Sequence, residues 1–194
     1  MRPHAPILLF AVALAGCASP HEQARAPAAT PAPAPTIGGA TVDPAATIAA
    51  NVVRAPDLAT FVKAMHAAGR DQTLAGPGPL TLFAPTNAAF GRLAPGTIDA
   101  LLKPENKPSL IKLLDYWIVD GRVTTADLRD RVQAGGGSAT LATAEGDALT
   151  VTLTGTVLTL TDVNGNKSYI EEGDVPQANG LIHVVNGVLI PDLG

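Results

Sequence analysis

Residues 81–90 read TLFAPTNAAF and residues 179–191 read NGLIHVVNGVLIP, and these two stretches decide the fold of the 194-residue chain. In the first stretch an apolar run ends at Pro85, which cannot donate a hydrogen bond within a sheet. Thr86 follows in the position of a helix N-cap, where its hydroxyl can accept a hydrogen bond from the next turn. The first stretch therefore predicts a strand, covered on both faces, that turns directly into a helix.

The second stretch contains two Asn-Gly pairs, at residues 179–180 and 186–187, and each pair favours a turn. Between the pairs, Leu181, His183 and Val185 share one face of a strand. The stretch therefore predicts a tight hairpin or a bulged strand. Because His183 lies between apolar neighbours, we expect a hydrogen-bonded core histidine, with a metal ligand or a catalytic base as the alternative.

Along the rest of the chain the spacing of apolar residues changes from helical to strand-like. Helices are predicted at residues 56–69, 97–103 and 108–118, and from 124 or 125 to 132. A Gly-Gly-Gly-Ser run at 135–138 is interpreted as a flexible connection. Alternation predicts strands at 149–153 and 157–161, and an Asn-Gly turn at 164–165 leads to a further strand near 169–170. Helices followed by antiparallel strands predict an α+β domain.

The N-terminus has the features of a lipoprotein signal. Arg2 precedes an apolar stretch too short to span a bilayer, and the sequence Leu-Ala-Gly-Cys at residues 14–17 resembles a bacterial lipobox. We expect residues 1–16 to be a signal peptide and Cys17, the one cysteine of the chain, to carry acyl chains such as palmitate. An ordinary signal peptide is the alternative. Ala18 favours the outer membrane, facing the periplasm or the cell surface.

Composition divides the mature chain into a tether and a domain. Residues 17–46 are rich in Ala and Pro and are expected to form an extended tether, and residues 47–194 are expected to form one domain. The whole chain has 13 basic and 17 acidic residues; without Arg2 of the signal peptide, 12 remain against 17, a net charge of −5. An acidic chain with no basic cluster is not expected to bind nucleic acid.

The two quoted stretches resemble the signature segments of the fasciclin-like domain family, and the resemblance extends over residues 47–191. It implies a wedge of about seven β-strands that carries a layer of short α-helices. Residues 113–123, LLDYWIVDGRV, resemble the central tyrosine-histidine segment of the family, with Trp117 in place of the histidine. In some members this segment is tied to receptor binding. The resemblance makes Tyr116 a candidate partner contact, and helical spacing places Trp117 in the core and Tyr116 about 100° away, toward the surface.

Other candidate chemical sites are weak. The histidines at 21, 66 and 183 have no metal-ligand spacing, and His66 is expected to face solvent. Residues 162–168 resemble the start of a calcium loop but lack its glycine and its final glutamate, so a hairpin turn is the preferred interpretation. Ser138 lacks the context of a hydrolase nucleophile, and Gly-Pro-Gly-Pro at 76–79 lacks the lysine of a phosphate loop. No metal, cofactor or enzymatic activity is expected.

The resemblance implies adhesion to other proteins or to surface polymers. We therefore expect a non-enzymatic, lipid-anchored interaction domain of the bacterial envelope that binds an envelope or extracellular protein or a polysaccharide. The first alternative is a periplasmic carrier of a small apolar ligand, held between the helices and the strands. A purely structural envelope protein is the second alternative.

Overall fold

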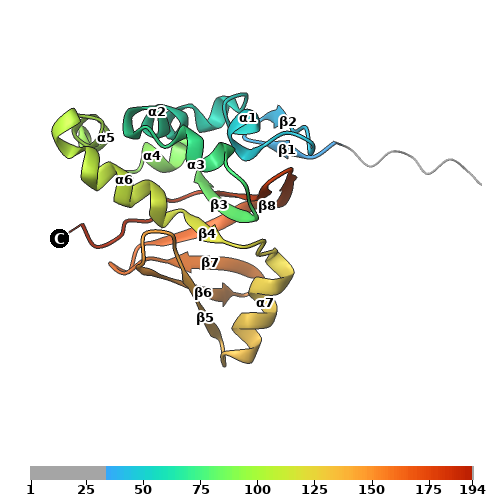
Figure 1. Ribbon diagram of the computed structural model, residues 1–194. Coiled ribbons are helices and arrows are strands. Elements are labelled where there is room, and N and C mark those ends of the chain that lie inside the picture. The colour runs from blue at the N-terminus through green and yellow to red at the C-terminus, as the bar shows by residue number, and fades with distance from the viewer. Residues whose placement is uncertain (1–33, 194) are drawn as a thin grey trace, which may run out of the picture. The chain divides into compact units, whose positions relative to one another are not determined.

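The computed structural model describes residues 34–193, which belong to one compact unit (Figure 1). The strands are β1 Thr36–Ile37, β2 Ala40–Thr41, β3 Leu80–Pro85, β4 Ile118–Asp120, β5 Ser138–Ala142, β6 Ala148–Thr154, β7 Val157–Thr161, β8 Lys167–Gln177 and β9 Gly180–Val185. The α-helices are α1 Ile48–Val52, α2 Ala59–Ala68, α3 Asp71–Ala75, α4 Asn87–Phe90, α5 Thr97–Leu101, α6 Lys107–Tyr116 and α7 Thr125–Ala134. Two 3₁₀ turns, Pro56–Leu58 and Pro104–Asn106, precede α2 and α6.

Seven strands form one sheet in the order β4-β3-β9-β8-β7-β6-β5, and β1 and β2 form a separate small hairpin. β3 and β9 run parallel, and the other neighbours in the sheet are antiparallel. The two ends of the sheet approach each other, since the amide of Ala144, just beyond β5, donates to the carbonyl of Ile118 in β4 at 2.8 Å. The sheet is therefore almost a barrel, and the predicted α+β wedge of seven strands with short helices is confirmed.

The two stretches that decided the sequence interpretation lie side by side in the centre of the sheet. Leu80 to Pro85 pair in parallel with Gly180 to Val185, and every residue of both strands is buried. The contact is so close at its start that a Cβ on Gly180 would lie 1.8 Å from the carbonyl oxygen of Leu80. Asn179 holds two helices to this point: its Oδ1 accepts from the amide of Ile48, and its Nδ2 donates to the carbonyl of Leu74.

Local signals in the sequence set the helix ends as predicted. Thr86 caps α4, its hydroxyl accepting from the amide of Ala89 at 3.2 Å. Gly69 ends α2 in a left-handed conformation with φ 71°. Thr124 caps α7 and forms a reciprocal capping box with Asp127, whose carboxylate accepts from the Thr124 amide. Tertiary packing of their apolar side chains contributes most of the stability of such short helices.

Three sequence predictions are wrong. The expected tether to residue 46 is too long, because residues 34–46 belong to the domain: Ile37 in β1 is completely buried and Val42 is 4% exposed. Of the tight hairpin or bulged strand expected at 179–191, the hairpin is absent, because residues 188–190 form no strand and the partners of β9 are β3 and β8. Ile118, expected to continue α6, begins β4, since pairing with Leu82 replaces the helical hydrogen bonds there.

Candidate functional site

His183 lies in the middle of β9 and joins three segments of the chain. Its ring is completely buried and stacks on Phe83 of β3, with 5.3 Å between ring centroids. Nε2 lies 2.8 Å from the carbonyl oxygen of Val123, just before α7, and Nδ1 accepts from the amide of Asp174 in β8 at 3.1 Å. An amide must donate to Nδ1, so the proton of the neutral ring lies on Nε2 and is donated to Val123. His183 is thus the hydrogen-bonded core histidine that the sequence predicts.

A backbone irregularity in β8 completes this arrangement. The pairing of β8 with β9 shifts register on both sides of Glu172, and Asp174 adopts a left-handed conformation with φ 59°. The Asp174 carboxylate accepts from the amide of Thr125 at 2.8 Å and from its hydroxyl, so it holds the first turn of α7. Burial lowers the pKa of His183, against the opposing effects of the Val123 carbonyl and the Asp174 charge. Because Nδ1 accepts from an amide, this arrangement requires the neutral imidazole, and both its nitrogens serve the fold.

Tyr116, the candidate partner contact, does not reach the surface. Its side chain is completely buried, and its hydroxyl donates to the carbonyl of Ala148 at 3.0 Å. Helical spacing alone places Tyr116 on a side of α6 that faces solvent. In the structure residues 145–148 cover this side, and Glu145 lies 3.8 Å from Lys112 of α6. Burial, with the nearby acidic residues, raises the pKa of Tyr116 to about 12. The expected surface position is wrong, and Tyr116 has no atom available to a partner.

Trp117 is a core residue, as predicted. It is completely buried at the C-terminal end of α6, and its Nε1 donates to the carbonyl of Leu189 at 2.8 Å. The rings of Phe61 in α2 and Phe90 in α4 lie 5.8 Å from it, one tilted and one edge-on. Trp117 therefore joins three helices to the C-terminal segment, and the tyrosine-tryptophan pair serves packing rather than contact.

The segment that resembles a calcium loop is a turn held by one carboxylate. Asp162 is 6% exposed, and its Oδ1 accepts from the amides of Asn164 and Asn166 at 2.9 and 2.8 Å. Its Oδ2 accepts from the Asn166 side chain and from the amide of Ile190, each at 2.8 Å. The carboxylate is fully used by N–H donors, so this is the hairpin turn that the sequence favoured.

The remaining sequence candidates lie apart from one another. His66 is exposed, as expected, and pairs with Asp71 at 2.6 Å. Ser138 is the first residue of β5, and the Gly-Pro-Gly-Pro run at 76–79 precedes β3. Among residues 34–193, no three His, Cys, Asp or Glu side chains are placed to hold a metal ion. Within the same range no helix has the length and apolarity to cross a membrane. Cys17 and His21 lie outside the described residues.

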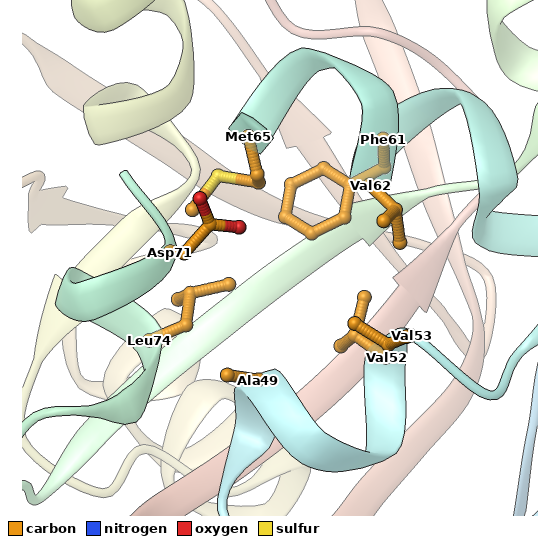
Figure 2. Close-up of a pocket in the computed structure, with 8 residues that line it drawn as sticks. All are labelled: Ala49, Val52, Val53, Phe61, Val62, Met65, Asp71 and Leu74. Carbon is orange, nitrogen blue, oxygen red and sulfur yellow. The ribbon is translucent and has the colours of Figure 1, made fainter. Parts of the chain in front are cut away.

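An apolar pocket lies between α1, α2 and α3 (Figure 2). Its lining is Ala49, Val52, Val53, Phe61, Val62, Met65, Asp71 and Leu74. The empty space within it is about 250 Å³, part of which is open to solvent. Pockets that bury small organic ligands are usually about 300–1,000 Å³. This pocket is below that range. The cleft between α7 and the strands is larger, about 590 Å³ including open solvent, but its lining includes Arg129 and Asp174, so neither supports a carrier of apolar ligands.

A different surface feature was not recognised from the sequence. The outward side chains of β5, β6 and β7 form what we call the threonine face: Ser138, Thr140, Ala142, Ala148, Thr150, Thr152, Thr154, Val157, Thr159 and Thr161. None of these side chains is charged. In the sequence this face appears only as an alternation of Leu or Val with Thr. The threonines form one surface because the pairing register of the three strands aligns them, and the sequence alone does not give that register.

Comparisons with known proteins agree on one family. A model of the fasciclin domain matches residues 56–191. The chain is 37% identical over 157 residues to protein sll1483 of Synechocystis sp., covering 81% of this chain and 80% of that protein. It is 30% identical over 168 residues to immunogenic protein MPB70 of Mycobacterium bovis, covering 84% and 77%. It is 32% identical over 136 residues to human periostin, covering 70% of this chain and 15% of periostin.

A solved structure shows the same fold. The domain aligns with a FAS1 domain pair from the insect cell adhesion molecule fasciclin I, with a TM-score of 0.67 and 19% sequence identity. The alignment covers 75% of this chain and 51% of that chain.

Proposed function

The chain belongs to the fasciclin domain family, and from that premise we propose that it is a lipid-anchored interaction domain of a bacterial envelope, which binds a protein or a surface polymer and catalyses no reaction. Domains of this family are generally non-enzymatic adhesion and interaction domains. The membrane, through acyl chains on Cys17, is the proposed site of attachment, and the outer membrane is its proposed location.

One structural observation carries the non-enzymatic part of this proposal. Three of the polar groups that the sequence offered for chemistry or contact are buried and engaged in the fold, whereas His66 and Ser138 are exposed and lie apart from them. His183 uses both ring nitrogens, Tyr116 donates to a backbone carbonyl, and the Asp162 carboxylate accepts four hydrogen bonds. Catalysis needs polar groups that can reach a substrate, whereas an interaction domain needs a rigid frame and an accessible surface.

Anchoring is proposed from the lone cysteine that follows Leu14-Ala15-Gly16. In a Cys17→Ser chain no thioether can form, and we expect the protein to leave the membrane fraction after a high-salt wash while the wild type stays. The substitution lies outside the described domain, so the domains of the two proteins are expected to melt at the same temperature. A serine variant that remains with washed membranes would contradict the lipid anchor but leave the interaction function open.

Native mass spectrometry of the protein purified from its own host separates an interaction domain from a carrier. The proposal predicts the mass of the protein alone, because the apolar pocket is smaller than most ligand sites. A stoichiometric small molecule that survives purification, and is lost when Val62 in the pocket wall is replaced by Trp, would favour the carrier instead.

A further inference from the structure

We propose that the threonine face is the surface through which this domain binds a neutral polysaccharide. The inference rests on the proposed interaction function and gives that function a surface and a partner class.

The threonine face is the uncovered side of its sheet. On the opposite side Leu149, Val151 and Leu160 are completely buried. The cleft between α7 and the sheet is lined by Leu158 and Ile170 of the apolar side, and by Val157 where the threonine face ends, so α7 lies on the apolar side and reaches that end. Within residues 34–193, α7 is the helix that makes repeated contacts with β5, β6 and β7 (Figure 1). Most of the outward side is therefore left open by the helix that packs most closely on these strands.

Exposure agrees with this orientation. Thr140 and Thr154 are exposed, and Thr150, Thr152 and Thr161 are partly exposed. The exception is Thr159 on the central strand β7, which is 1% exposed and shares a hydrogen bond of 2.8 Å with the Thr154 hydroxyl. Five of the six threonines can thus be reached from solvent, and the sixth, Thr159, holds the Thr154 hydroxyl in place.

The register of the strands sets the threonines in rows. One row runs Ser138, Thr152, Thr159, Tyr169, and the next runs Thr140, Thr150, Thr161, Lys167. Neighbours within a row are about 4.8 Å apart, and rows are separated by about 6.8 Å along the strands. The face is consequently a regular grid of hydroxyl and methyl groups, closed on the β8 side by an aromatic ring and an ammonium group.

This chemistry matches a neutral sugar polymer. Each threonine offers a hydroxyl that donates and accepts, beside a methyl group, and a pyranose ring offers hydroxyls beside C–H groups. The ten positions of the face carry no charge, so a charged polymer gains an ion pair only at the β8 border, where Lys167 continues one row. A row of hydroxyls can satisfy the hydroxyls of such a polymer without desolvating any charge.

Strand propensity alone accounts for threonine but not for the lack of charge. Thr is favoured in strands, and proteins commonly guard an exposed edge strand with lysine, proline or other charged residues. β5 is the last strand in the sheet order, and although the residue beyond its end pairs with β4, Ser138–Ala142 itself contains none of these. The edge and the face next to it are both neutral, as a surface for an uncharged extended polymer would be.

Co-sedimentation tests the proposal. The detergent-solubilised full chain is mixed with an insoluble neutral β-glucan or with an insoluble polyuronate, and the bound fraction is measured as a function of polymer concentration. Thr150→Val with Thr152→Val removes two hydroxyls from adjacent rows and keeps the shape and strand propensity of the side chains. Thr60→Val, on α2 and partly exposed, is the matched control.

We expect the wild type and Thr60→Val to sediment with the neutral glucan and not with the polyuronate. The double valine variant should bind about tenfold more weakly, as loss of two hydrogen bonds predicts, while its melting temperature stays within a few degrees of wild type. Failure of the wild type to bind, preference for the polyuronate, or equal binding by the double variant would overturn the assignment. If the double variant also captures envelope partners as wild type does, the interaction function stands and the threonine face is not its site.

Discussion

Replacing His183 by alanine removes two hydrogen bonds and one stacked ring from the centre of the sheet. The Nε2 bond to Val123 and the Nδ1 bond from Asp174 each contribute about 1 kcal/mol, and loss of packing on Phe83 adds about 1 kcal/mol. We expect the free energy of unfolding to fall by about 3 kcal/mol. The matched control is His66→Ala, an exposed histidine on α2, which should change it by less than about 0.5 kcal/mol.

The same substitution has a distinct pH dependence. Because burial lowers the pKa of His183 in the folded state, the unfolded chain takes up a proton as pH falls below about 6.5 and the folded protein does not. The stability that the neutral ring supplies is therefore complete above that pH and is lost as pH falls toward the lower folded pKa. The loss has a slope of at most about 1.4 kcal/mol per pH unit.

Urea unfolding of wild type and His183→Ala from pH 8 to pH 5 measures both effects. The difference between the two proteins should be largest at pH 8 and should shrink toward pH 5, because the alanine variant lacks this titration. Other titrating groups are shared and cancel. A difference that is small at pH 8, or one that grows in acid, would refute the assignment of His183 as a neutral structural residue.

Three further substitutions test the packing. Trp117→Ala should lower the free energy of unfolding by about 3–5 kcal/mol in urea melts, as loss of a buried aromatic does; a cost below about 1 kcal/mol would contradict its central position. Tyr116→Phe should cost about 1 kcal/mol and leave partner capture unchanged; a folded variant that no longer captures its partner would restore Tyr116 as a contact. Gly180→Ala should cost about 3 kcal/mol or more because its Cβ would overlap the Leu80 carbonyl, whereas Gly155→Ala in an open turn should cost about 1 kcal/mol; equal costs would contradict the close approach of β3 and β9.

The sequence predicted those elements that local chemistry determines. Thr86 and Thr124 cap helices because a hydroxyl can satisfy an amide of the first turn wherever the chain goes next. Gly69 ends α2 because glycine adopts a positive φ without steric cost. The strands of the Leu-Thr alternation also follow from a pattern within a few residues. These signals, together with the family resemblance, were sufficient for the fold class.

Features that depend on distant segments were not predictable from local patterns. The parallel pairing of β3 with β9 joins residues about 100 positions apart. α1 and α3 have five residues each, too few to show a helical period. Residues 34–46 resemble a tether in composition, yet the two large apolar residues among them, Ile37 and Val42, are enough to bury this segment.

The candidate site shows the same limit. Helical spacing correctly separates Trp117 from Tyr116 by about 100°, but it does not show which other segment of the chain covers the Tyr116 side of the helix. The Tyr116 side is covered by Ala148, the first residue of β6, and by the connection between β5 and β6 that precedes it. The threonine face likewise depends on the pairing register of three strands, which the sequence did not show.

Photoactivated crosslinking on intact cells tests the central claim most directly, since the reagent reacts with proteins and with polymers alike. The tagged chain is captured after irradiation, and its crosslinked products are identified by mass and by sugar analysis. If the chain is an interaction domain at the envelope, specific crosslinked products should contain an envelope protein or a polysaccharide. A control protein, in which an unrelated domain follows the same lipid-attachment sequence, should not give these products. Recovery of the chain alone, or of products identical to those of that unrelated domain, would contradict the claim.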